Sequence, residues 1–389
     1  MEPWAGVYTD ASLSISQRSN YGMREEAMAI KRQQVASGTP ATTAMITHGA
    51  NPGLVSYFLK RAMLNIAKDR GISLPTQSFG EEDGEAENKA EAPDCLLTKT
   101  QWCELARSLG LQAIHIAERD TQVAATPRPK GCFTNTWSVD GFVSEGCQPA
   151  ELGFGTHERA LPADGHRHEF GCDAAIYLNQ PGASTRVRSW TPLEGPYHGF
   201  LITHNESISI ADFLTLRDAT TGEAIYRPTV HYAYHPCNDA VLSLHELAGK
   251  NWAQPASKLV MMSEIVDGND ELGVLLMGVD PQSGSSWAYW YGSQLSVHDA
   301  RRMAEFNSAT SLQVAATCLS GMVWAMKHPN MGILEPDEVP FEDILKIADP
   351  YLQPLVGVYT DWTPTQNRGV LFPEAIDLDS PFQFKNVRV

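Results

Sequence analysis

Segment 115–146 limits most strongly which folds this chain can adopt, because it places two carboxylates beside short apolar runs. A strand is predicted at 113–116, and Glu118 lies at its end. A second strand is predicted at 142–143, and it is followed by Glu145. Strand ends and the loops after them are where α/β enzymes usually place their chemistry. The segment therefore predicts an α/β fold with two functional acids near one sheet edge.

Trp137 lies between the two acids in the sequence. An aromatic face flanked by carboxylates suits an organic cation, because the ring quadrupole and the anions both stabilise positive charge. The alternative is an ordinary core tryptophan with two surface acids. The pattern predicts a site for a cationic ligand at Trp137, Glu118 and Glu145.

A strand, a glycine-bearing turn and a helix are predicted at 42–47, 48–53 and 54–68. This layout is typical of dinucleotide-binding folds, in which backbone N–H groups at a helix start face the ligand. Any βα unit with a glycine in its turn has the same pattern. The G-x-G-x-x-G fingerprint is not found, since Gly153-Phe154-Gly155 has Glu158 at the third glycine position.

The middle of the chain is rich in predicted strands, which favours a largely antiparallel sheet in a second, α+β domain. These strands are predicted at 174–178, 185–190, 199–203, 207–213 and 225–234, and helices at 21–35, 98–109, 239–247 and 309–327. We predict that residues 1–65 and 305–389 form a Rossmann-type part and that residues 66–304 form the α+β domain.

Other polar groups are candidates for the same chemistry. His204 ends an apolar run and is followed by Asn205 and Glu206, either of which could orient its ring. Three acids, Asp267, Asp270 and Glu271, either bind a cation or are turn residues. Two His/Cys clusters, His166/His168/Cys172 and His231/His235/Cys237, lack a second ligand pair, so no metal site is predicted.

The composition of the chain indicates which classes of partner it can bind. The net charge of −17 argues against nucleic acid, which requires a basic surface, and fits a cationic partner. Seven cysteines without a C-x-x-C motif indicate reduced thiols and a cytoplasmic protein. No apolar leader follows Met1, and the apolar run 312–326 is interrupted by polar residues. It predicts a packed helix and no membrane span.

Several long strings, in order along the chain, together resemble the homospermidine synthases of the saccharopine dehydrogenase-like group. They are E-P-W at 2–4, G-A-N-P-G at 49–53, H-I-A-E-R-D at 115–120, N-T-W-S-V-D-G-F-V-S-E-G at 135–146, R-V-R-S-W-T-P at 186–192, T-H-N-E-S-I-S-I-A-D-F at 203–213, and H-Y-A-Y-H-P-C-N-D-A-V-L-S-L-H-E at 231–246.

The resemblance implies an NAD-dependent transferase that joins two putrescines, or putrescine and spermidine, through an imine. It implies that Trp137 stabilises the cationic imine, and that Glu118, Glu145 and His204 bind ammonium groups or move protons. It further implies a diamine pocket containing Glu2, Asn20 and Asp267, and a nicotinamide contact at Ala50, Asn51 and Pro52. A homodimer is the expected assembly.

The family has a nucleotide-binding half upstream of the E-P-W string, whereas Met1 directly precedes Glu2 here. The expected fold is therefore an incomplete Rossmann-type domain plus the α+β domain. Two other functions stay open: an inactive or split-enzyme chain that binds polyamine or a separate chain supplying the missing half, and a dehydrogenase with net redox. The dehydrogenase needs an arginine pair for a substrate carboxylate, for which Arg186 and Arg188 are available.

Overall fold

The computed structural model describes residues 10–38, 41–74 and 97–389. Its helices are α1 (Asn20–Ser37), α2 (Leu54–Asp69), α3 (Lys99–Ser108), α4 (Val139–Cys147), α5 (Asn205–Phe213), α6 (Asn238–Gly249), α7 (Val297–Met303), α8 (Ala309–Lys327), α9 (Phe341–Ala348) and α10 (Phe384–Val387), with short 3-10 turns η2 (Gly182–Ser184), η3 (Pro336–Glu338) and η4 (Asp349–Tyr351).

The strands are β1 (Ala44–Met45), β2 (Leu111–Asp120), β3 (Val123–Ala124), β4 (Cys132–Asn135), β5 (Pro149–Gly153), β6 (Gly165–Arg167), β7 (Ala175–Pro181), β8 (Arg186–Thr191), β9 (Gly195–Phe200), β10 (Leu216–Arg217), β11 (Ala224–Tyr226), β12 (Thr229–His235), β13 (Ser257–Val260), β14 (Ile265–Asp267), β15 (Asn269–Val279), β16 (Ser286–Ser296), β17 (Ile333–Leu334) and β18 (Leu355–Thr360).

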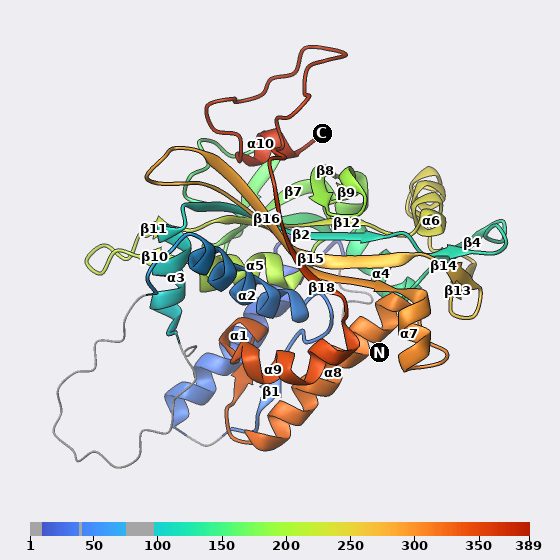
Figure 1. Ribbon diagram of the computed structural model, residues 1–389, viewed down its shortest axis with the longest axis horizontal. Coiled ribbons are helices and arrows are strands. Elements are labelled where there is room, and N and C mark those ends of the chain that lie inside the picture. The colour runs from blue at the N-terminus through green and yellow to red at the C-terminus, as the bar shows by residue number, and fades with distance from the viewer. Residues whose placement is uncertain (1–9, 39–40, 75–96) are drawn as a thin grey trace.

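One 10-stranded sheet organises the molecule, in the order β18-β16-β15-β2-β12-β5-β7-β6, with β9 pairing β12 and β8. Within it β2 and β12 run parallel, and the other pairings among the described residues are antiparallel. Figure 1 shows α2 and α5 on one side of this sheet, with α1, α8 and α9 in a further layer beyond them. The α/β prediction with a largely antiparallel sheet is confirmed.

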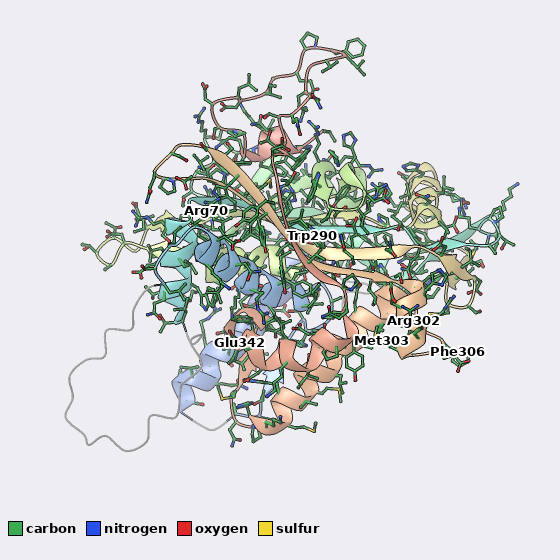
Figure 2. The ribbon with its side chains drawn as sticks, viewed as in Figure 1. Arg70, Trp290, Arg302, Met303, Phe306 and Glu342 are labelled. Carbon is green, nitrogen blue, oxygen red and sulfur yellow. The ribbon has the colours of Figure 1, made fainter. Side chains whose placement is uncertain are left out.

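Alternation along the central strands separates two cores. Ile114 and Ile116 of β2 face the core that includes α2, whereas Ala113 and Ala117 face a second core with Trp290. Trp290 is fully buried in β16 (Figure 2), and it packs so closely on Gly273 that a β-carbon there would lie 2.4 Å from its ring. Side chains alternate between the two faces of a strand. The residues two and four positions after Ile116 therefore face α2 as well.

A small parallel pair, β1 with β17, lies apart from the main sheet. The prediction of a buried strand over 42–47 is wrong in length and burial: only two residues pair, one of them exposed. The turn and the helix that follow are confirmed, since α2 begins at Leu54.

Two predicted strands are helices. Residues 142–143 lie in α4, which begins after Ser138 accepts a hydrogen bond from the Gly141 N–H, so Glu145 is on a helix and not at a strand end. Residues 207–213 lie in α5, which is buried on every side. Its alternating Ile and Ser positions therefore mimic the two-residue period of a strand.

By length and composition, α8 is the one helix among the described residues that could cross a membrane, and half of its most apolar stretch is buried inside the structure. Gln313, Thr317 and Ser320 are buried along it. The helix packs on α9 and on β15. It is a packed helix, as predicted.

The predicted boundaries between a Rossmann-type part and an α+β domain stay a prediction. The structure adds two observations that bear on them. The strand β18, from the C-terminal segment, extends the main sheet beside β16. One apolar core includes residues of α2 and α9 as well as residues of β2 and β12.

Candidate active site

Three carboxylates lie buried on one face of the central strands. Glu118 and Asp120 of β2 continue the column that faces α2, and Asp270 of β15 is paired directly with Asp120 across the two strands. Their residues are 3%, 2% and 0% exposed. Like charges directly opposite each other in a sheet are destabilising, and buried charges require partners. This arrangement is therefore stabilised by protonation of the acids or by a bound cation.

Neighbouring side chains hold two of these carboxylates in place. Asp120 accepts hydrogen bonds from the Gln122 backbone N–H at 2.8 Å, the Gln122 side-chain amide at 3.0 Å and the Thr136 hydroxyl at 2.6 Å. Asp270 accepts a hydrogen bond from Thr310, in the first turn of α8, at 2.5 Å. The Gln122 amide also donates to Thr310, which links both acids to the start of α8.

Burial raises the pKa of all three acids. It raises the pKa of Glu118 to about 7, and the adjacent Asp120 adds to the shift, while hydrogen bonds from Tyr232 and Asn51 oppose it. For Asp270, burial and then the charges of Glu118 and Asp120 hold the pKa well above its usual range. The shifts follow from removing anions from water beside like charges. An organic cation placed here would be strongly favoured.

An aromatic wall stands next to the acids. The Trp137 indole N–H donates to the Tyr234 hydroxyl oxygen at 2.8 Å. The Tyr234 ring stacks on Tyr232, with centroids 5.1 Å apart and planes within 8°. Phe142 packs on both Trp137 and Tyr234. Trp137 directly precedes the Ser138 cap of α4, so the start of that helix places the indole.

His204 is held between two carboxylates. Its Nε2 lies 3.1 Å from Glu145 Oε2, and its Nδ1 lies 3.1 Å from Glu206 Oε1. Its ring packs against Tyr232, with centroids 4.2 Å apart. Burial alone lowers the pKa of an imidazole, but Glu206 and Glu145 outweigh it and raise the pKa of His204 to about 10. The ring is therefore a fixed cation at neutral pH.

The turn before α2 contacts the same cluster of side chains. Asn51 donates its side-chain amide to Glu118 and to the Tyr232 hydroxyl oxygen, the latter at 2.8 Å. Gly53 has φ +130°, and a β-carbon there would meet the backbone of Gly49. The first α2 N–H groups bond the carbonyls of this turn: Leu54 to Gly49, Val55 to Ala50 and Ser56 to Gly53. These three N–H groups are therefore already bonded within the turn and are not available to a diphosphate.

The structure brings five predicted residues into one connected cluster: Trp137, Glu118, Glu145, His204 and Asn51. Asn20, the first residue of α1, and Pro52 line a small pocket together with Glu145 and His204. Ala50 is buried in the same turn. Two predicted residues are not placed there. Glu2 lies outside the described residues, and Asp267 is exposed and paired with His298.

Three residues of the cluster were missed from the sequence: Asp120, Tyr232 and Tyr234. A fourth, Asp270, was considered there as a cation ligand or a turn residue, but Asp267 was assigned to the pocket in its place. All four lie on the face that carries Glu118. Once the strands are assigned, the spacing of two residues in E-R-D and in Y-A-Y indicates that the two acids share a face and that the two tyrosines share a face. Of the three acids Asp267, Asp270 and Glu271, the structure places Asp270 near Glu118, whereas Asp267 ends β14 and is exposed.

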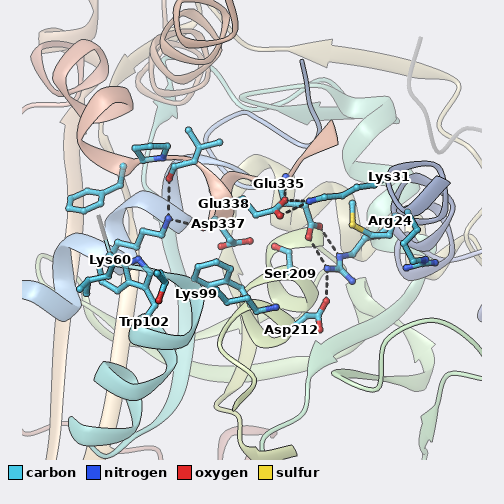
Figure 3. A pocket seen from close by; sticks show the side chains of 18 residues that line it. Arg24, Lys31, Lys60, Lys99, Trp102, Ser209, Asp212, Glu335, Asp337 and Glu338 are labelled. Carbon is cyan, nitrogen blue, oxygen red and sulfur yellow. Dashed lines mark hydrogen bonds and ion pairs between the residues drawn. The ribbon is translucent and has the colours of Figure 1, made fainter. Parts of the chain in front are cut away.

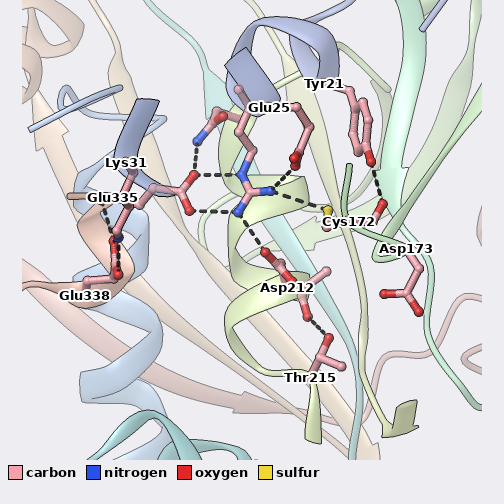
Figure 4. Close-up of polar contacts among 12 residues, drawn as sticks. Tyr21, Glu25, Lys31, Cys172, Asp173, Asp212, Thr215, Glu335 and Glu338 are labelled. Atoms are coloured by element: carbon pink, nitrogen blue, oxygen red, sulfur yellow. Dashed lines mark hydrogen bonds and ion pairs between the residues drawn. The ribbon is translucent and has the colours of Figure 1, made fainter. Parts of the chain in front are cut away.

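A buried ion network anchors the helix that carries Asn20. Arg24 of α1 bonds Glu335 through its Nε at 2.7 Å, and its Nη2 bonds Asp212 at 2.9 Å. Figure 4 shows the carboxylates of Glu25, Asp212 and Glu335 gathered at this point. Glu335 also accepts a hydrogen bond from Asn205, the neighbour of His204, at 3.3 Å. The network connects the position of α1 to that of the cluster.

A larger cavity of about 490 Å³ lies between α1, α2, α3, α5 and the segment 335–341. Figure 3 shows Lys60, Trp102 and Asp337 on its walls. Lys60 donates to the carbonyls of Asp337 and Val339 at 2.7 and 3.0 Å. None of the predicted site residues lines this cavity, so the chemistry that the sequence predicts lies elsewhere.

The arginines and histidines considered from the sequence have other contacts. The Arg186 guanidinium lies over the Phe200 ring, and Arg188 donates to the carbonyls of Pro364 and Gln366. His168 stacks on Tyr21. Within residues 10–38, 41–74 and 97–389, no group of three or more potential metal ligands has the geometry of a metal site.

Comparisons with known proteins match the whole chain. The family described as Saccharopine dehydrogenase C-terminal domain matches residues 49–361. The homospermidine synthase of Blastochloris viridis is 54% identical over 389 residues, which is 100% of this chain and 76% of that protein. The homospermidine synthase of Mesorhizobium japonicum is 48% identical over 392 residues, 100% of this chain and 75% of that protein.

A solved structure is similar as well. The homospermidine synthase of Legionella pneumophila, in complex with NAD, superposes with a TM-score of 0.83 at 50% identity. The match covers 96% of this chain and 74% of that chain. The chain thus spans about three quarters of the length of these relatives.

Proposed function

Because the chain belongs to the homospermidine synthase family, we propose that it joins two diamines at the carboxylate and indole cluster. One putrescine loses a hydride from the carbon beside a nitrogen and a proton from that nitrogen, which gives an imine. The amine of the second putrescine adds to the imine carbon and ammonia leaves. The hydride then returns to the same carbon, so two putrescines give homospermidine and ammonia without net redox change.

The cofactor is NAD, which when bound supplies the acceptor and then the donor of the hydride. Ala50, Asn51 and Pro52 are the residues of this chain that we assign to its nicotinamide end. Asn51 supports the assignment, since its amide already bonds Glu118 and Tyr232 within the amine cluster.

Substrate binding rests on the three buried carboxylates. A diamine carries two ammonium groups at neutral pH, and it pays a desolvation cost on entering a dry site. Glu118, Asp120 and Asp270 would hold one ammonium, and Glu145 beside His204 would meet the other. The facing pair Asp120 and Asp270 is the observation that carries the proposal, because no described cationic side chain bonds either acid.

Proton transfer is assigned to Glu118. The attacking nitrogen must be neutral, so a nearby group has to accept a proton near pH 7. Glu118 suits this role because burial raises its pKa to about 7. His204, whose pKa is raised to about 10 by Glu206 and Glu145, stays protonated and instead fixes the position of Glu145.

Trp137 is assigned to the charged intermediate. The iminium is a delocalised cation, and an indole face stabilises it more than the neutral species on either side of the step. The hydrogen bond from its Nε1 to Tyr234 holds the ring at a fixed tilt.

The other functions have less support. A net dehydrogenase acting on a carboxylated amine needs arginines at the site, but Arg186 and Arg188 contact Phe200 and backbone carbonyls instead. A chain that only binds polyamine does not account for 54% identity to a synthase along its full length.

We further propose that the protein acts in the cytoplasm as a homodimer on putrescine or spermidine. The six described cysteines are all unpaired, which supports a reducing compartment. Val370, Leu371 and Phe372 are 76%, 87% and 78% exposed on the segment before α10, which supports an interface that covers them.

The test is product analysis. The purified chain is incubated with putrescine and a small fraction of an equivalent of NAD. Formation of homospermidine and ammonia in equal amounts, many times the amount of NAD, supports the synthase. Stoichiometric NADH release would support a net dehydrogenase, and binding of putrescine without product would support the binding-only function.

A further inference from the structure

Tyr232 and Tyr234 contact four of the side chains to which the proposed function assigns roles. The Tyr232 hydroxyl donates to Glu118 and accepts from Asn51, and its ring packs on His204. The Tyr234 hydroxyl oxygen accepts the indole N–H of Trp137. Both tyrosines are buried on the same face of β12 and stack on each other.

We propose that Tyr232 and Tyr234 are positioning residues that hold the carboxylate, amide, imidazole and indole of this site in one fixed arrangement. The inference rests on the proposed diamine chemistry and adds residues to it. A fixed arrangement matters because displacing a reacting group by about 1 Å can cost on the order of a hundredfold in rate.

A purely structural role would leave different contacts. Two other tyrosines donate their hydroxyls to backbone carbonyls: the half-buried Tyr226 of β11 bonds the Leu111 carbonyl at 3.0 Å, and the buried Tyr197 of β9 bonds the Ala233 carbonyl at 2.7 Å. Among the described residues, the hydrogen-bond partners of the Tyr232 and Tyr234 hydroxyls are instead side chains of the cluster. Because the two tyrosines lie between Glu118 and Trp137, they fix the position of the proton acceptor relative to the aromatic wall.

Tyr232 has a second consequence for Glu118. A hydrogen bond donated to a carboxylate favours its charged form, so the phenol opposes the upward pKa shift that burial causes. The other titratable groups that interact with Glu118 are Asp120, Asp270, His204 and the phenols of Tyr197 and Tyr234. The charge of Glu206 acts on Tyr232 itself. These groups remain in place when only the Tyr232 hydroxyl is removed. Its removal takes away the bond to Glu118 and the acceptor of one Asn51 bond, so a change in proton affinity reports on the loss of this phenol.

Three matched variants test the inference: Tyr232→Phe, Tyr234→Phe and, as the control, Tyr226→Phe. In Tyr232→Phe we expect the acidic limb of the kcat profile to move up by about one pH unit, which is the usual worth of a hydrogen bond to a charged group. In Tyr234→Phe we expect kcat to fall by about tenfold or more with the limb unmoved, because the indole loses its anchor. Tyr226→Phe should match the wild type in both.

Calorimetry of putrescine binding at about pH 8, in two buffers of different ionisation heat, gives a readout that needs no turnover. Glu118 is ionised in the wild type at this pH and should release few protons, whereas Tyr232→Phe should release more as the dication binds.

The inference is overturned if both site variants match Tyr226→Phe in kcat, pH limb and proton release. It is overturned too, together with the binding part of the proposed function, if the wild type binds no putrescine. Wild-type binding without homospermidine refutes only the synthase, and the proton count still decides the role of Tyr232.

Discussion

Glu118 is the residue at which the different contacts of the site meet. It accepts hydrogen bonds from Tyr232 and Asn51, it shares a strand with Asp120, and its charge is felt by Asp270. Because burial raises its pKa to about 7, it can exist in either protonation state under physiological conditions. An acid with that property beside a cation site is suited to take a proton from an ammonium and return it.

Glu118→Gln should separate catalysis from stability. The amide cannot accept a proton from the substrate, so kcat should fall by about a hundredfold or more, the usual worth of a general base. The variant keeps an oxygen that can accept the bonds from Tyr232 and Asn51, so the fold should persist. Steady-state assays of homospermidine formation with the wild type and the variant check the loss.

The same variant tests the pKa of Glu118 through the free energy of unfolding. A carboxyl whose pKa rises from 4.5 to about 7 on folding contributes stability that is present below 4.5 and is lost as pH rises through about 7. Glu118→Gln should therefore melt above the wild type near pH 8, and the gap should close near pH 4.5. A gap that does not change with pH would contradict the assigned shift.

Trp137→Phe keeps an aromatic ring and removes both the larger quadrupole and the bond to Tyr234. One cation–π contact is worth about 0.5–2 kcal/mol, so we expect a loss of roughly 2–30-fold in kcat with a small change in melting temperature. Trp137→Ala should lose more. A fall of many degrees in melting temperature with unchanged putrescine turnover would assign Trp137 to the core instead.

At the scale of elements, the helices α2, α3, α6 and α8 and the strands β2, β7, β8 and β12 could be predicted from periodicity and capping residues. The helices α4 and α5 could not, because both are almost fully buried and a buried helix has no polar face to show a 3.6-residue period. Of the predicted catalytic residues, Glu145 lies on α4 and His204 directly precedes α5. The structure therefore changes their local setting but keeps them together.

Most of the site residues that were not assigned from the sequence share one physical cause. Asp270, Tyr232 and Tyr234 join Glu118 only through the pairing of β2 with β12 and β15, whereas Asp120 lies on β2 itself, two residues after Glu118. Register between strands depends on contacts far apart in the chain, which no local pattern contains. Asp267 and Asp270 illustrate the same difficulty. They are three residues apart, yet the first is exposed and the second is buried.

Helix α4 has a testable part in the site. Ser138 caps it, and removing such a cap costs about 0.5–2 kcal/mol. Because Trp137 directly precedes the cap, Ser138→Ala should lower both the free energy of unfolding and kcat. The control Thr98→Ala removes the equivalent cap of α3, far from the cluster, and should lower stability alone. Equal kcat values for the two variants would show that the cap does not position the indole.

At the scale of the whole molecule, the segment between β18 and α10 extends away from the sheet on the side opposite α8 (Figure 1). It is braced at its base, since Arg188 bonds the carbonyls of Pro364 and Gln366, and Arg368 bonds that of Asn386 at 2.7 Å. The exposed Val370, Leu371 and Phe372 are therefore presented on an ordered support.

If this segment forms the dimer contact, Leu371→Glu with Phe372→Glu should convert the dimer to a monomer, since charges buried in an apolar interface are costly. Light scattering coupled to gel filtration measures the mass directly. The control Leu378→Glu alters another exposed apolar residue of the same segment. A wild type that elutes as a monomer, or a double variant that stays dimeric, would refute this interface.

The central claim is that the hydride withdrawn from one diamine is the hydride returned to the new carbon–nitrogen bond. Putrescine deuterated at both carbons next to nitrogen, incubated with the protein and a small amount of unlabelled NAD, tests it by mass spectrometry. We predict homospermidine that keeps all the deuterium of both diamines, because the deuteride is removed and restored at the same carbon. Homospermidine that is one deuterium short, or deuterated NADH that accumulates without homospermidine, would contradict the account.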